Sequence, residues 1–170
     1  MSVRRTRLIA CALVASCAVT IGACSNNDSG NSADVSVSTT TESAAQFHAD
    51  AVDPVTAASI SDPQDDPGLH LTYEIQDANY NSEGSGSVIY VLVRNNNDVA
   101  LPIDALGTPT LKVNGQDVAP VESGSLGLDL PLGPHSATNL AFAFNTSYNN
   151  LYQATFQIGN VIYNGNIANA

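Results

Sequence analysis

Basic residues are scarce in this sequence. The 170 residues hold five Lys+Arg against 16 Asp+Glu, and three of the five are Arg4, Arg5 and Arg7. If the first 23 residues are removed, Arg94 and Lys112 remain, and the net charge becomes 2 − 16 = −14. Such a charge repels polyanions, so nucleic acid is not expected as a partner. Apart from this, an acidic surface of this kind favours solubility and does not indicate a particular function.

Cysteine is almost absent, and tryptophan is absent altogether. Cys11 and Cys17 lie in an apolar segment near the start, and the third cysteine is Cys24. If that segment is cleaved off, one thiol is left, and an intramolecular disulfide is excluded. Any core must then be built from Val, Ile, Leu, Tyr and Phe.

Motifs that carry chemistry are also missing. The glycine- and serine-containing stretches at 84–87 and 124–127 do not supply a G-x-S-x-G nucleophile elbow, and no phosphate-binding G-x-x-x-x-G-K occurs. His48, His70 and His135 do not have the sequence spacing of a metal site. The alternative is that His70 and His135 lie close together in the fold and bind one metal ion. We therefore expect no enzyme activity, no cofactor and no metal, and we interpret the histidines as exposed loop residues.

The first 23 residues have the features of an export signal. An uncharged apolar run, 8–23, follows the three arginines. It is shorter than the roughly 20 residues that a permanent membrane helix needs. A positive start, a short apolar stretch and small residues at its end indicate a signal peptide, 1–23. The general secretory route is favoured; the twin-arginine route is the alternative, because Arg4-Arg5 is similar to its signal although Arg7 stands where that motif has an apolar residue.

The end of that segment reads Ile21-Gly22-Ala23-Cys24, which resembles the lipobox of bacterial lipoproteins. The resemblance implies that the Cys24 thiol receives a diacylglyceryl group and that Cys24 becomes the new N-terminus, carrying fatty acids such as palmitate. At least two acyl chains give stable anchoring. The expected location is then the extracytoplasmic face of the cell membrane. The alternative is an ordinary cleaved signal, with Cys24 incidental.

Residues 24–67 are mostly small and polar. Such a tract buries too little surface to offset its conformational entropy, so we expect a disordered tether. Residues 68–170 are then expected to form one domain.

That domain has a hydrophobic period of two. Alternating or apolar runs occur every 8–12 residues with turn residues between them, which favours an all-β, antiparallel β-sandwich. Asn114-Gly115 predicts a type I′ hairpin turn. The expected strands are 71–76, 88–93 (central, with both faces covered), 110–113, 116–119, 139–144, 151–158 and 161–163.

Four stretches, "VIYVLVRNNNDVALPI", "LKVNGQDV", "LPLGPHSATNLAFAF" and "IGNVIYNGNI", give the domain a resemblance to a known family. The chain resembles the telokin-like immunoglobulin-fold domain of exported actinobacterial and Firmicute proteins over residues 69–168. The resemblance implies an immunoglobulin-like sandwich, and the family is mostly of unknown function. The chain departs from antibody domains because it has no cysteine pair and no tryptophan.

Two loops are candidates for binding. The segment 123–132 carries leucines in a connecting position, and exposed apolar clusters mark interaction sites; the four are Leu126, Leu128, Leu130 and Leu132. The alternative is that they alternate along a further strand. Asn95–Asp98 and the acidic residues at 62–66 are interpreted as turn-building residues, with a weak calcium site as the alternative.

The sequence thus predicts a lipid-anchored, immunoglobulin-like lipoprotein that acts as a binding or interaction module in the cell envelope. Its expected partners are the membrane, through Cys24, and an unidentified envelope protein or wall component. The alternative function is a carrier that holds a small apolar ligand or lipid between its sheets.

Overall fold

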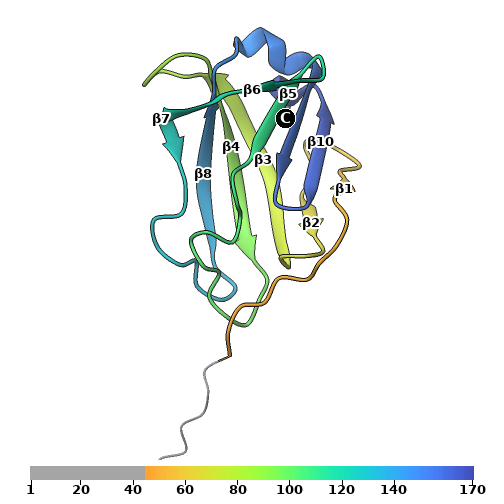
Figure 1. The fold of residues 1–170 in the computed structure, drawn as a ribbon, viewed down its shortest axis with the longest axis vertical. Coiled ribbons are helices and arrows are strands. Elements are labelled where there is room, and N and C mark those ends of the chain that lie inside the picture. The colour runs from red at the N-terminus through yellow and green to blue at the C-terminus, as the bar shows by residue number, and fades with distance from the viewer. Residues whose placement is uncertain (1–44) are drawn as a thin grey trace, which may run out of the picture. The chain divides into compact units, whose positions relative to one another are not determined.

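The computed structural model describes residues 45–170, which form ten strands and two 3-10 turns (Figure 1). The expected signal peptide, Cys24 and most of the expected tether lie outside the described residues. Within them, no helix has the length and apolarity needed to span a membrane. The elements are β1 (Val55–Thr56), β2 (Gln64–Asp66), β3 (Leu71–Tyr80), β4 (Ser87–Asn95), β5 (Thr110–Val113), β6 (Gln116–Val118), β7 (Pro120–Leu126), β8 (Ala137–Phe144), η1 (Tyr148–Gln153), β9 (Ala154–Ile158), β10 (Val161–Gly165) and η2 (Ile167–Asn169).

The strands make two five-stranded sheets. The first has the order β2-β3-β4-β8-β7 and is antiparallel throughout; the second has the order β1-β10-β9-β5-β6, with β1 parallel to β10. The expectation of an all-β fold built on antiparallel sheets is therefore confirmed at this level. In Figure 1 the two sheets lie next to each other, with β5 in front of β3 and β4.

One hydrophobic core joins the inward faces of both sheets. Leu71, Tyr73 and Ile75 alternate inward along β3 as the sequence predicted, and each is at most 2 % exposed. From the first sheet, Phe144 meets Phe156 of the second edge-on, with ring centroids 6.1 Å apart. Aromatic contacts between β8 and β9 thus stabilise the centre of a domain that has no tryptophan.

The predicted hairpin at Asn114-Gly115 is confirmed. The two residues have φ of 51° and 76°, as a type I′ turn requires, and β5 pairs with β6 on either side of them.

Two strand predictions are corrected. The expected strand 151–158 starts at Ala154, because Leu151 turns its side chain into the core from the 3-10 turn η1. β4 is central, between β3 and β8, but its outer face is covered at one end only: Val88 is buried against Ala141 and Ala143, whereas Tyr90 is exposed.

The expected boundary between tether and domain, at residue 67, lies too late in the chain. β1 and β2 belong to the two sheets, and Phe47 and Ile60 pack against the core. Composition alone did not indicate this, because β1 and β2 are short strands held by backbone pairing to β10 and β3 rather than by apolar side chains of their own. Residues 24–44 of the expected tether are outside the described part.

Candidate binding surfaces

A buried carboxylate, Asp66, joins the two sheets where β2 ends. Its Oδ1 accepts hydrogen bonds from the backbone N–H groups of Gly68 (2.9 Å) and Leu69 (3.0 Å) and from Asn160 Nδ2 (2.9 Å). Its Oδ2 accepts from the Tyr73 hydroxyl (3.0 Å) and the Asn160 backbone N–H (2.8 Å). Burial raises the pKa of Asp66, but the hydrogen bonds from Asn160, Leu69 and Gly68 outweigh it and hold that pKa below its usual value. Every contact of this carboxylate is internal.

The Asn95–Asp98 segment is built in the same way. Asn95 is buried, and its Nδ2 donates to the backbone carbonyls of Val99 (2.9 Å), Leu132 (3.1 Å) and Gly133 (3.0 Å). Its Oδ1 accepts from the backbone N–H of Asn97 at 3.0 Å. These bonds support the interpretation of the asparagines as turn-building residues. Residues 45–170 contain no group of three or more His, Cys, Asp or Glu side chains placed to hold a metal ion.

The histidines of the domain form two separate pairs. His70 Nε2 lies 3.0 Å from Asp50 Oδ2, and His135 Nε2 lies 2.9 Å from Asp98 Oδ1. All four side chains are at least half exposed. His70 and His135 each bond to an aspartate of their own, and His48 is exposed on the segment before β1.

The four leucines of the 123–132 segment do not share one face. Leu126 ends β7 and is 59 % exposed, and Leu130 is 70 % exposed in the loop that follows. Leu128 packs partly against the core, and Leu132 is buried and bridges to Leu101. The segment is therefore strand up to Leu126 and loop beyond it, and its role in interaction stays a prediction for the two outward leucines.

An apolar hollow of about 430 Å³ lies beside this segment. Phe142, Phe144 and Val121 line it from β7 and β8, and Pro109 from the connection that leads to β5. The inward side chains of the two sheets pack into one core, whereas this hollow is open to solvent.

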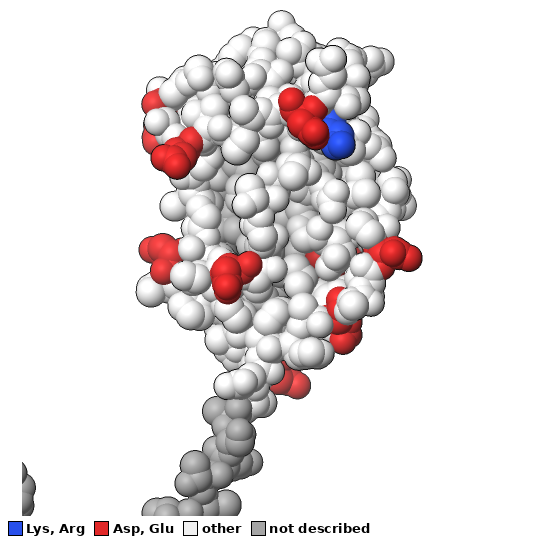
Figure 2. All heavy atoms as spheres, viewed as in Figure 1, with Lys and Arg blue, Asp and Glu red and all other residues white. Residues whose placement is uncertain are grey.

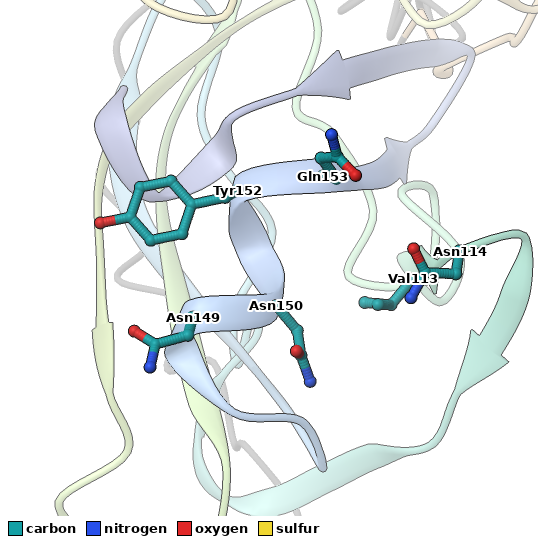
Figure 3. A pocket seen from close by; sticks show the side chains of 6 residues that line it. All are labelled: Val113, Asn114, Asn149, Asn150, Tyr152 and Gln153. Carbon is teal, nitrogen blue, oxygen red and sulfur yellow. The ribbon is translucent and has the colours of Figure 1, made fainter.

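A different hollow, of about 340 Å³, lies between the β5–β6 hairpin and η1 (Figure 3). None of its lining residues carries a formal charge; they are Val113, Asn114, Asn149, Asn150, Tyr152 and Gln153. Asn150 Nδ2 donates to Thr146 Oγ1 at 2.9 Å, whereas the side chains of Asn114, Asn149 and Gln153 make no hydrogen bond to any other residue within 45–170.

The 3-10 geometry of η1 explains why its polar residues face outward. With three residues per turn, side chains at i and i+3 lie in line. Tyr148 and Leu151 form the inward column, because the Tyr148 hydroxyl donates to the Ala168 carbonyl at 3.0 Å and Leu151 is fully buried. Asn149 and Tyr152 then form an outward column, and Figure 3 shows both projecting to the same side.

A second hollow, of about 300 Å³, continues the first over the outer face of β5, β9 and β10. The two hollows share Asn114 and Gln153. We call the pair the amide groove, which is lined by residues 112–115, 149–150, 152–155 and 164–165. Its floor includes a cross-strand row of Lys112, Thr155 and Asn164. Lys112 Nζ lies 3.3 Å from Asp117 Oδ1, so the cation of the groove is already paired.

Sequence reasoning missed the amide groove. The run Tyr148-Asn149-Asn150-Leu151-Tyr152-Gln153 was a signal, since tyrosine and carboxamides are unusually dense in it, but it was interpreted in part as a strand. Comparisons of the chain with protein-family models, with curated proteins and with solved structures found no match.

Proposed function

We propose that this chain is a lipid-anchored, extracytoplasmic lipoprotein whose immunoglobulin-like domain binds a component of the cell envelope. The observation that carries the proposal is Ile21-Gly22-Ala23-Cys24 at the end of an uncharged apolar run that follows three arginines. A diacylglyceryl group on Cys24 holds the acidic domain at the membrane, where the charge of the domain alone gives no attraction to anionic head groups.

The strand order supports the immunoglobulin-like type. Immunoglobulin sandwiches place strands A-B-E-D in one sheet and G-F-C in the other, and the variable type adds C′ and C″ beside C; the described strands include a counterpart of C′ and none of C″. Taking β3 to β10 as A, B, C, C′, D, E, F and G in chain order, the orders β3-β4-β8-β7 and β10-β9-β5-β6 reproduce both sheets. β1 and β2 are then additions at the sheet edges. This correspondence agrees with the telokin-like resemblance of the sequence.

The surface chemistry supports binding rather than catalysis or nucleic-acid recognition. Figure 2 shows acidic side chains scattered over one face, with wide uncharged areas between them and a basic side chain next to an acidic one. The basic side chains of the described residues are Arg94, 3.9 Å from Glu74, and Lys112, 3.3 Å from Asp117. The uncharged areas of the surface, the amide groove among them, are the ones that we assign to binding.

Metabolic labelling with radioactive palmitate tests the anchor. The full chain, produced in a bacterial host that processes lipoproteins, is expected to carry label in the membrane fraction, and Cys24→Ala is expected to lose it. Cys17→Ala is the matched control, because Cys17 lies inside the segment that is removed and its loss leaves the labelling unchanged. Unlabelled parent protein with an intact N-terminus in the cytosol would refute the proposal.

Mild crosslinking of intact envelopes, followed by detergent solubilisation and pull-down, tests the binding role. The expected product is an adduct of the chain with a wall fragment or an envelope protein. Recovery of the free monomer alone, at crosslinker concentrations that capture known envelope complexes, would argue against a binding module.

The apolar hollow lined by Phe142 and Phe144 favours a second function, the carriage of a small apolar ligand or lipid. Native mass spectrometry of the protein purified from its own host should then show a mass above that of the lipidated chain. Val121→Trp, which fills the hollow from β7, should abolish this extra mass. An unliganded mass in the parent protein would remove the carrier function and leave the envelope-binding role intact.

A further inference from the structure

We infer that the amide groove binds a neutral carbohydrate chain. The inference rests on the proposed binding function and names the chemistry of the partner, a polyhydroxylated and uncharged polymer such as a wall polysaccharide. Four features of the groove support it: its carboxamides, the exposed ring of Tyr152, its size and its charge.

The carboxamides are suited to sugar hydroxyls. Each Asn or Gln side chain offers two N–H donors beside an acceptor oxygen, and a pair of neighbouring hydroxyls on a sugar ring presents the complementary acceptor and donor. Asn114, Asn149 and Gln153 have this full capacity available, because none of the three is bonded to another residue within 45–170. They line the groove from two elements, Asn114 from the hairpin tip and Asn149 and Gln153 from η1.

Tyr152, the one tyrosine that lines the groove, supplies the apolar surface that the C–H face of a sugar ring needs. Tyr152 lines the groove at 49 % exposure; its ring lies 6.2 Å from that of Tyr148, which lies 5.1 Å from that of Tyr80. Tyr148 is fixed by its hydrogen bond to Ala168, so the ring of Tyr152 rests against a supported neighbour. Tyrosine presents a large apolar face at low conformational cost and a polar tip to solvent.

The groove is longer than a single sugar needs. Two hollows of about 340 Å³ and 300 Å³ adjoin at Asn114 and Gln153 and run from η1 over the outer face of β5, β9 and β10. An extended chain of several sugars fits this shape better than one compact molecule does. The floor under the second hollow is also polar, with the Thr155 hydroxyl donating to Asn164 Oδ1 at 2.7 Å.

The charge of the groove disfavours a phosphate-bearing polymer, and its polar lining disfavours an apolar ligand. A phosphate-bearing polymer needs unpaired cations, but Lys112 is already paired with Asp117. An apolar ligand would find carboxamides and hydroxyls in place of the phenylalanines and prolines of the hollow beside β7. A neutral, hydrogen-bonding chain is the partner that these residues favour.

The test is a glycan array probed with the full chain in detergent micelles. The array carries neutral oligosaccharides of hexoses and pentoses, together with uronic-acid-containing and sulfated ones. We expect binding to a subset of the neutral members, followed by titration calorimetry on the best of them. Tyr152→Ala should weaken that binding at least about tenfold, which is ~1.4 kcal/mol, whereas Tyr152→Phe, which keeps the ring, should retain most of it.

Matched substitutions separate the groove from the rest of the surface. Asn149→Ala should weaken binding about fivefold, the effect of one lost hydrogen bond of ~1 kcal/mol. Tyr90→Ala, at an exposed tyrosine on the other sheet, and Asn96→Ala, at an exposed asparagine beyond the opposite end of β9, should bind as the parent does. Circular dichroism checks that each variant is folded.

The inference fails if the array shows no neutral member bound at millimolar concentration, if charged members alone are bound, or if Tyr152→Ala and Asn149→Ala both bind like the parent. Its failure is distinguishable from that of the proposed function. A chain that carries palmitate and crosslinks to an envelope protein, but leaves the array blank, keeps the proposed function and loses the carbohydrate. A chain that binds neutral glycans through Tyr152 but carries no palmitate loses the anchor and keeps the groove.

Discussion

The two ends of β9 use the same residue types in opposite ways. Asp66, which bonds to Asn160 just after β9, and Asn95, at the end of β4, are buried, and their side chains bond to backbone groups of their own domain. Where β9 begins, Asn149 and Gln153 are exposed around an open groove and bond to no residue within 45–170. The first set has used its hydrogen-bonding capacity to build the fold, and the second still has that capacity available for a partner.

The difference teaches that residue type alone does not distinguish a structural asparagine from a binding one. Burial of the side chain and the number of its hydrogen bonds within the protein distinguish the two. Removal of a buried amide deletes hydrogen bonds that water does not replace, whereas an exposed amide exchanges one set of water bonds for another. The comparison is sharpened by substitutions on each side, which should change stability at one end and recognition at the other.

Asp66→Ala should give the largest loss of stability. It removes the acceptor of five hydrogen bonds and leaves buried donors from Gly68, Leu69 and Asn160 without partners. Charge-assisted bonds of this kind are strong, and we expect the free energy of unfolding to fall by about 3–5 kcal/mol. Urea denaturation followed by circular dichroism measures it. Asp65→Ala is the control, since Asp65 is exposed and accepts from the Thr72 hydroxyl; a loss as large there would contradict the special role of Asp66.

Asn95→Ala should give the next largest effect. The carbonyl of Val99 loses the donor that Asn95 provides, and those of Leu132 and Gly133 keep only the backbone N–H groups of Leu101 and Ser136. We expect a loss of about 2–3 kcal/mol in the same urea assay. Asn96→Ala, at an exposed neighbour that donates to the Thr72 hydroxyl, should cost less than about 1 kcal/mol. Equal losses in the two variants would mean that burial does not separate them.

The sequence indicated much of the fold because its signals were local. The alternation of Leu71, Tyr73 and Ile75 and the Asn114-Gly115 turn follow from periodicity and from backbone angles that few residues tolerate. The sequence did not predict that 55–56 and 64–66 are strands, because their own residues carry no strand pattern. β1 is held by pairing with β10, about a hundred residues further along the chain, and β2 by pairing with β3. Asp66 is the clearest case: it was interpreted as one of the turn-building acidic residues at 62–66, and its bonds to Asn160 exist only in the folded chain.

The candidate site was less predictable than the fold for the same reason. The groove brings together residues 112–115 of the hairpin and 149–155 around η1. These segments are adjacent only in the folded chain, so no local sequence pattern predicts their contact. The leucine segment had a visible pattern but was divided by the fold, because Leu132 pairs with Leu101 and turns inward while Leu130 turns outward.

The acid limb of the stability profile should depend on Asp66. Its pKa in the folded chain is held below the usual value of about 4, so the ionised carboxylate stabilises the fold above that value, and this contribution is lost as the pH falls through the folded pKa. The free energy of unfolding should therefore fall less steeply below about pH 4 in Asp66→Asn than in the parent. Urea titrations at a series of pH values measure both slopes, and parallel slopes would show that Asp66 titrates alike in the folded and unfolded chains.

The smallest effect on stability is expected at the groove. In the double variant Asn149→Ala, Tyr152→Ala the lost contacts are the edge-on packing of Tyr152 against Tyr148 and water bonds of an exposed amide, so the free energy of unfolding should change by less than about 1 kcal/mol. Leu151, which lies between the two positions and anchors η1 in the core, is unchanged. The urea midpoint of the double variant should stay close to that of the parent while its glycan binding is lost. A large fall in the midpoint would place these residues with Asp66 and Asn95, as parts of the framework, and the contrast between the two ends of β9 would disappear.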